Sequence, residues 1–322
     1  MRADVVFLAV IAVPFALLAT DIDESSPLES EPWFTGPLLA PTAEVIPVGH
    51  FNLEPYIFAT ANTAVYNKEW HSQKIPTLWV INPLCLVQAG ITSWLDFQFI
   101  PSFQYAHRSG AAAWELQDWT FQLDAQLIAQ SSWFPSIRFS VIETIPLGNY
   151  RNLNPKKLRT DQSGFGSWAT DFQLVFAQLY HIRGHYFMNW RLALTGSIPA
   201  PVHVKGFNTY GGGYGTNGTT YPGKEFSWDF AIEINLSRNW TFACDVVGSW
   251  VFSGRFRGNP GQSVFGTPAT NVLPPSVVYS VAPAIEYNWN ESIGLIAGWW
   301  GSFAGKNSNK FSSFVIAFNY YK

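Results

Sequence analysis

From about residue 50 onward, apolar and polar side chains alternate along the chain in segments of about ten residues. Between Leu95 and Tyr105, one parity is almost wholly large and apolar and the other is mostly polar. The same alternation recurs in 119–127 and 226–236 and, more weakly, in 314–320. Because successive side chains of a strand point to opposite faces, this pattern predicts strands whose two faces meet different surroundings.

Twelve segments of this kind can be counted, and the connections between them differ in length. The predicted strands span residues 50–60, 75–89, 94–107, 114–129, 135–145, 167–180, 185–197, 224–236, 240–252, 276–288, 292–303 and 311–321. Connections after the even-numbered strands are short. Those after the odd-numbered strands are longer, and the longest are residues 147–166, 197–223 and 253–275. The sequence therefore predicts an all-β fold, a closed antiparallel transmembrane β-barrel of about 12 strands with short periplasmic turns and long extracellular loops.

The composition supports a barrel embedded in lipid. Charged residues make up 13% of the chain, where a soluble domain averages about 25%, and aromatic residues make up 17%. Many Trp side chains fall near the predicted strand ends, where aromatic rings meet lipid headgroups. The alternative is a secreted β-sandwich whose aromatic side chains stack on carbohydrate. Its outward face would carry Lys, Glu and Thr rather than a continuous row of large apolar side chains.

Several other classes of protein are excluded. The only long uncharged apolar stretch is 5–20, which rules out a bundle of several transmembrane helices. The net charge of −3 and the pI of about 6.1 give no basic surface for a nucleic acid. Two cysteines, Cys85 and Cys244, cannot build a disulfide scaffold or a zinc site. We expect no cofactor and no metal ion.

The chain divides into three parts. Residues 1–20 begin with a base, continue with an apolar run and end in small residues, which predicts a signal peptide cleaved after Ala19 or Thr20. Residues 21–49 are acidic and rich in Pro and are expected to form an extended periplasmic segment before the first strand. Residues 50–322 form the predicted barrel, placed in the outer membrane of a Gram-negative bacterium.

The polar parity of the strands carries nine acids and two bases that are expected to face the lumen. They are Glu54, Asp96, Asp118, Asp124, Arg138, Asp171, Arg191, Asp229, Glu233, Asp245 and Glu286. Rings of carboxylates attract cations, so one interpretation is a pore for cations or polar solutes. The other is a structural network of hydrogen bonds across a narrow barrel, and twelve strands lie between filled and open interiors.

One feature suggests an enzyme. His107 and Ser109 lie two residues apart on the parity expected to face lipid, and a histidine that activates a serine could attack a lipid ester. The pair resembles the His-x-Ser pair of outer-membrane phospholipase A, another twelve-strand barrel. That family also needs an amide partner on the neighbouring strand, for which Gln117 is the nearest candidate of the same parity.

A second resemblance covers residues 45–322 in outline. The turn at residues 90–97, Gly-Ile-Thr-Ser-Trp-Leu-Asp-Phe, is similar to a turn of the outer-membrane proteins grouped with the MetA pathway of phenol degradation. Residues 118–124, 282–287 and 294–298 resemble later strands of that family. The resemblance implies a transporter-like β-barrel and supplies no catalytic residues. Here Ser93 and Trp94 replace the acid and base that are usual in the family's turn.

Three hypotheses follow. The first is an outer-membrane channel for small solutes, either hydrophobic or aromatic compounds or cations passing an acidic lumen. The second is a lipid-hydrolysing barrel, and the third is a structural barrel whose long loops contact a partner. Outer-membrane lipids are expected as surroundings in all three cases, and a nucleic acid in none.

Overall fold

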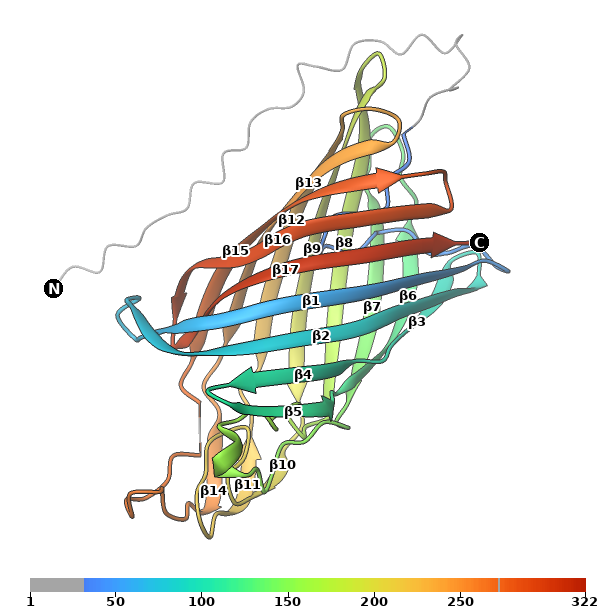
Figure 1. Cartoon of the computed structure of the whole chain (residues 1–322). Coiled ribbons are helices and arrows are strands. Elements are labelled where there is room, and N and C mark those ends of the chain that lie inside the picture. The colour runs from blue at the N-terminus through green and yellow to red at the C-terminus, as the bar shows by residue number, and fades with distance from the viewer. Residues whose placement is uncertain (1–31, 272) are drawn as a thin grey trace, which may run out of the picture.

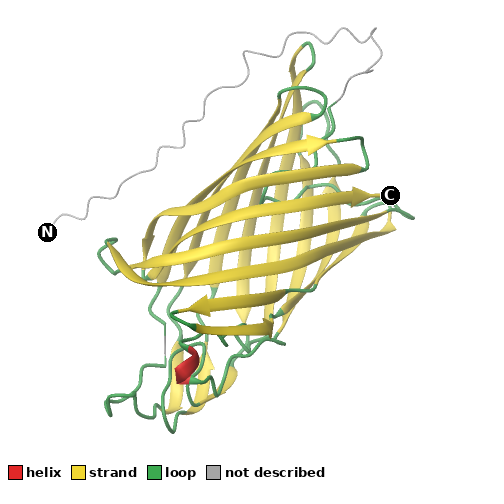
Figure 2. Cartoon of the chain, in the orientation of Figure 1, coloured by secondary structure: helices red, strands yellow, loops and turns green. Residues whose placement is uncertain are grey.

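The computed structural model describes residues 32–271 and 273–322. The predicted signal peptide, residues 1–20, and the first part of the acidic segment lie outside the described residues. Within the described part, the fold is all-β apart from one short 3-10 helix, η2 (Pro155–Lys157) (Figure 2). No described helix is long and apolar enough to cross a membrane.

Most of the described chain forms one closed antiparallel barrel (Figure 1). Its strands are β1 (Phe51–Tyr66), β2 (Ser72–Thr92), β3 (Leu95–Ile100), β4 (Phe103–Arg108), β5 (Ala111–Leu116), β6 (Trp119–Ile128), β7 (Ser136–Ile145), β8 (Ala169–Arg183), β9 (Tyr186–Pro199), β12 (Glu225–Asn235), β13 (Trp240–Val251), β15 (Ser276–Asn288), β16 (Ile293–Lys306) and β17 (Ser308–Tyr321). Strand β1 pairs with both β17 and β2, which closes the sheet. Closure gives the backbone N–H and C=O groups of the wall a partner, as lipid surroundings require.

The fourteen strands make up twelve strands of the barrel wall, because two wall strands are each interrupted once along their length. Strands β3 and β4 form one wall strand interrupted at Pro101 and Ser102, and β5 and β6 form the next, interrupted at Gln117 and Asp118. Proline has no N–H to donate to a sheet, so the ladder breaks there. The two breaks lie side by side, since the Gln117 N–H donates to the Ser102 carbonyl over 3.0 Å. The predicted strand number is confirmed.

Large apolar side chains cover the outside of the barrel. Five examples from five strands are 44–55% exposed, namely Ile57, Leu123, Phe172, Trp299 and Phe314. A continuous apolar belt of this kind is stable against lipid tails and would be costly in water. This finding and the closed wall confirm a transmembrane barrel of the outer-membrane type.

The connections follow the predicted asymmetry, with one difference. The turns at one end are short, and three long loops project from the other end. However, the turns after β1, β4 and β16 at the long-loop end are also tight, because the flanking strands run further than the alternation predicted. Among the described residues, the long extracellular loops are therefore 146–168, 200–224 and 252–275.

The three long loops pack together as a cap over the extracellular end (Figure 1). Part of the cap is a small antiparallel sheet of β10 (Val202–Lys205), β11 (Asn217–Tyr221) and β14 (Arg255–Asn259). One face of this sheet is buried, with Val202 and Val204 packed against Tyr210. The cap thus has a small core of its own.

Candidate transport lumen

A layer of charged side chains crosses the interior of the barrel. Five carboxylates in it are 0% exposed, namely Asp96, Asp124, Glu233, Asp245 and Glu286. Two buried guanidinium groups oppose them: Arg138 Nε lies 3.4 Å from Asp124 Oδ1, and Arg191 Nε lies 3.0 Å from Glu233 Oε2. A buried carboxylate is costly without a partner, so the other three must be compensated in another way.

The compensation comes from the acidic, Pro-rich segment before β1. Asp245 on β13 accepts hydrogen bonds from three successive backbone N–H groups, those of Leu38 (3.1 Å), Leu39 (3.3 Å) and Ala40 (2.9 Å). Three consecutive N–H groups around one carboxylate form a small anion-binding concavity. The segment therefore enters the lumen, with its backbone turned toward the acids of the wall.

Two further carboxylates hold the segment on either side of this point. Glu286 on β15 accepts from the Thr35 N–H over 3.0 Å, and Asp96 on β3 accepts from the Ile46 N–H over 2.8 Å. Hydrogen bonds to a charged acceptor are stronger than neutral ones. The segment expected to extend in the periplasm instead runs inside the barrel, from Thr35 to Ile46.

Packing also fits the segment to the wall. Leu38 is 1% exposed and lies in a cluster with small residues of three wall strands, among them Ala243, Ala282 and Ala317. On β2, a Cβ atom at Gly90 would lie 2.2 Å from the Pro47 carbonyl oxygen, so only glycine admits the segment there. Small wall residues thus leave room for a chain inside the lumen.

The segment and the charged layer separate two cavities. The extracellular cavity has a volume of about 510 Å³ and lies between the cap and the barrel. The periplasmic cavity has a volume of about 460 Å³ and is lined by the segment, the ends of β1 and β2, and both lumen arginines. No residue lines both cavities in the described part of the chain. The charged layer and the segment therefore lie between two separate cavities of one lumen.

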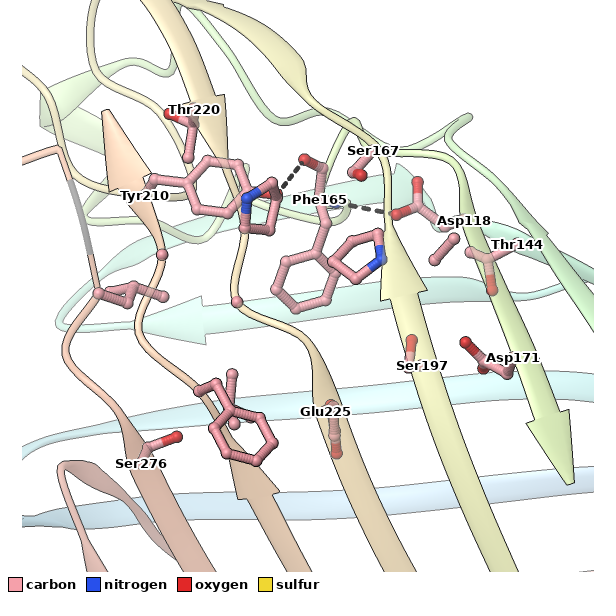
Figure 3. A pocket seen from close by; sticks show the side chains of 18 of the residues that line it. Asp118, Thr144, Phe165, Ser167, Asp171, Ser197, Tyr210, Thr220, Glu225 and Ser276 are labelled. Atoms are coloured by element: carbon pink, nitrogen blue, oxygen red, sulfur yellow. Dashed lines mark hydrogen bonds between the residues drawn. The ribbon is translucent and has the colours of Figure 1, made fainter. Parts of the chain in front are cut away.

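The extracellular cavity combines apolar walls with acidic side chains (Figure 3). Its apolar side chains include Phe165, Phe252 and Leu273, and its acids are Asp118, Asp171 and Glu225. Among the described residues, no Lys, Arg or His lines it. Asp171 on β8 and Glu225 on β12 each pair with Ser197 of β9, the strand between them. Figure 3 shows the three side chains on neighbouring parts of the wall. Such a cavity favours neutral or cationic guests over anions.

Asp118 has a structural role in this cavity. Its two carboxylate oxygens accept the Gly148 and Phe165 N–H groups, each over 2.8 Å, and this fixes both ends of one long loop. The Tyr210 hydroxyl donates to the Phe165 carbonyl over 3.0 Å, as the dashed line in Figure 3 marks. Burial raises the pKa of Tyr210, so its hydroxyl remains protonated and able to donate. These bonds fix the cap over the cavity.

The other predicted lumen acids lie apart from this network. Glu54 lines the periplasmic cavity and accepts from Asn52, Tyr56 and Asn319. Asp229 is half-buried in the wall, and its Oδ1 atom has no hydrogen-bond partner among the described residues. Ten of the eleven predicted residues thus border the two cavities or belong to the layer between them, and Asp229 borders neither cavity.

The structure does not bring His107, Ser109 and Gln117 together as the lipid-hydrolysing hypothesis requires. Ser109 and Gly110 both have positive φ angles, 47° and 87°, and form the tight turn between β4 and β5. No hydrogen bond joins His107 to Ser109 in the described part of the chain. Gln117 was placed on the wrong face: it accepts from Asn82 over 2.6 Å and donates to Gln104 over 2.9 Å, inside the barrel. The break at Gln117 and Asp118 turns both side chains inward.

Glu225, the first residue of β12, was not among the predicted lumen acids although it lies within the predicted strand. Its parity is that of Asp229 and Glu233 on the same strand, so the period of two was the available signal. The contacts of the N-terminal segment had no such signal, since they are made by backbone N–H groups.

Known proteins resemble this chain in their fold. No family model matches the chain, and no curated protein matches it. A solved structure, the COG4313 outer membrane channel from Pseudomonas putida F1, is similar with a TM-score of 0.67 and 13% identity, over 87% of this chain and 98% of that one. What the two share is the fold.

Two further solved structures are less similar to this chain. The NanC porin has a TM-score of 0.42 and 8% identity over 83% of this chain and 98% of its own. A mutant of the TodX monoaromatic hydrocarbon channel has a TM-score of 0.40 and 12% identity over 86% of this chain and 91% of its own.

Proposed function

We propose that the protein is a passive outer-membrane channel for small solutes that are neutral or cationic and carry apolar surface. Solutes enter the extracellular cavity, pass the N-terminal segment when it moves, and leave through the periplasmic cavity. The observation that supports this most directly is the pair of cavities at opposite ends of one lumen, divided by a segment that hydrogen bonds hold in place. Passage requires displacement of that segment, so the resting conductance is expected to be low.

The chemistry of the extracellular cavity supports the solute class. Its apolar walls suit hydrophobic or aromatic groups, and its carboxylates repel anions. A unit charge at about 4 Å from another contributes about 1 kcal/mol in water, so two carboxylates change the partition of a monovalent ion by more than tenfold. The similar fold of a protein described as an outer membrane channel agrees with this function.

The test compares three solutes of similar size that do not cross lipid unaided: benzyltrimethylammonium, phenyl glucoside and benzenesulfonate. Uptake into liposomes that contain the full-length protein is expected in that order, the cation fastest. The double variant Asp171→Asn, Glu225→Gln should reduce the ratio of cation to anion uptake about tenfold or more. Glu69→Gln, which removes an exposed carboxylate in the turn after β1, is the matched control and should leave the ratio unchanged.

Two results would contradict the proposal. One is a folded barrel that admits none of the three solutes even when the hydrogen bonds that hold the N-terminal segment are weakened. The other is faster uptake of the anion than of the cation. The lipid-hydrolysing alternative has a separate assay. The lipid-hydrolysing hypothesis would be supported if the purified protein hydrolysed phospholipid and the variant Ser109→Ala did not. We expect no hydrolysis, because His107 and Ser109 are not hydrogen-bonded and Gln117 faces the interior.

A further inference from the structure

The extracellular cap carries a charge opposite to that of the lumen. Across 146–168, 200–224 and 252–275 there are eight Lys and Arg residues but one acid, Asp161, although the whole chain has 22 Asp and Glu. The bases are Arg151, Lys156, Lys157, Arg159, Lys205, Lys224, Arg255 and Arg257. All except Lys157 are exposed, and in the described part of the chain none forms an ion pair. The cap therefore presents uncompensated positive charge to the outside.

The small sheet of the cap gathers part of this charge on one flat face. Side chains alternate along β10, so that Val202 and Val204 point into the cap, whereas His203 and Lys205 are exposed. The register aligns His203 with Thr219 and then with Arg257 across the three strands. Lys205, Arg255 and Arg257, with His203, thus lie on the outward face of β10, β11 and β14, which we call the basic face.

The arginines of the basic face are held in position. Arg255 lies over the Tyr221 ring, with Cζ 4.5 Å from its centroid, and Arg257 lies on the same ring at 5.7 Å. Stacking on an aromatic ring limits the rotamers of a guanidinium group while its N–H groups stay free. Side chains two residues apart on a strand are about 7 Å apart, so two anionic groups can bind side by side. The face is arranged for an acceptor with several negative charges.

We propose that the basic face binds the phosphate groups of lipopolysaccharide, the glycolipid of the outer leaflet. Long barrel loops are extracellular, so the cap stands among the sugars and phosphates of that leaflet. Arginine binds phosphate with two parallel hydrogen bonds, which suits the stacked Arg255 and Arg257. A soluble anion that enters the channel is a poorer candidate, because the cavity behind the sheet is acidic. The proposal depends on the extracellular placement of the cap and not on solute passage.

The experiment measures binding of purified lipopolysaccharide to the full-length protein in neutral detergent, with dephosphorylated lipopolysaccharide and inorganic phosphate as further probes. Arg255→Gln with Arg257→Gln should weaken binding of the phosphorylated glycolipid about tenfold or more. Arg183→Gln, an exposed arginine at the periplasmic end of β8, is the matched control and should change it less than about twofold. Salt at about 1 M should weaken binding by wild type, because exposed charges are then screened.

Four results would overturn the proposal. They are equal binding of dephosphorylated and phosphorylated glycolipid, an unchanged affinity in the double variant, an equal loss in the control, and displacement by inorganic phosphate at matched phosphate concentration. Both arginines are exposed, so the variants should fold. A shift in gel migration on heating, equal to that of wild type, checks this, and Lys205→Gln tests the same face with a third residue. Conductance does not enter these measurements, so their failure would leave the proposed channel untouched.

Discussion

Asp245→Asn is the change that most directly tests whether carboxylates of the wall hold the N-terminal segment in the lumen. Asp245 accepts three backbone N–H groups from Leu38, Leu39 and Ala40 at 2.9–3.3 Å. Asparagine has nearly the same shape, but one of its two acceptor oxygens becomes an NH₂ group and its charge is lost. The variant should weaken the segment's attachment with little change in the packing of the wall.

The size of the effect can be worked from these contacts. Hydrogen bonds to a charged group contribute about 1.5–3 kcal/mol each, and a neutral acceptor about half as much. Two bonds that fall to half and one that is lost together cost about 3–6 kcal/mol, which shifts the equilibrium between the docked and displaced segment by about 100-fold or more. Glu286 and Asp96 still hold the segment at Thr35 and Ile46, so displacement should be transient.

The assay is single-channel recording in planar bilayers at neutral pH. Wild type should show a low conductance with rare openings, and Asp245→Asn should open far more often with the same open-state conductance. Asp229→Asn is the matched control, because it removes a lumen carboxylate from the adjacent strand that accepts no N–H of the segment in the described structure. Equal behaviour of the two variants, or no change in either, would refute the role of Asp245 as an anchor.

Three further predictions follow from the same contacts. Gly90→Ala should also raise the open probability, because the added methyl overlaps the Pro47 carbonyl at 2.2 Å, while the gel shift of the folded barrel stays unchanged. Asp118→Asn should speed proteolytic cleavage in residues 146–168 by tenfold or more, since it weakens bonds to Gly148 and Phe165 that together contribute about 3–6 kcal/mol; unchanged cleavage would contradict this anchor. The purified protein should migrate faster on a denaturing gel before heating than after it, because a closed wall resists detergent, and migration unaffected by heat would argue against closure.

The alternation of side chains was enough to predict the barrel because lipid and lumen act on every residue of each strand. Residues 276–288 were predicted as a strand with the same bounds that β15 has in the structure. Extensions of β1, β16 and β17 beyond the predicted ends were missed, because the alternation weakens where a strand leaves the lipid. The position of Gln117 was wrong because a break in a strand shifts the parity on one side of it, and no local signal fixes how two residues at a break will turn.

The location of the N-terminal segment could not be predicted for a different reason. Its hydrogen bonds to Asp245 come from Leu38, Leu39 and Ala40, whose side chains give no sign of a polar contact. Any residue except proline offers the same N–H group, so the interaction leaves no pattern in the sequence. The acids of the wall were visible, but their partners were not.

This distinction bears on the two interpretations of the acidic lumen. In the buried layer, Asp96, Asp245 and Glu286 each accept at least one backbone N–H group of the segment, and without the segment they would lose these partners. Their number therefore reflects a structural requirement of a filled lumen and is no measure of cation preference. Asp171 and Glu225 differ, because they border an open cavity that no base lines among the described residues. If the channel discriminates by charge, it must do so at the extracellular cavity, before a solute reaches the segment.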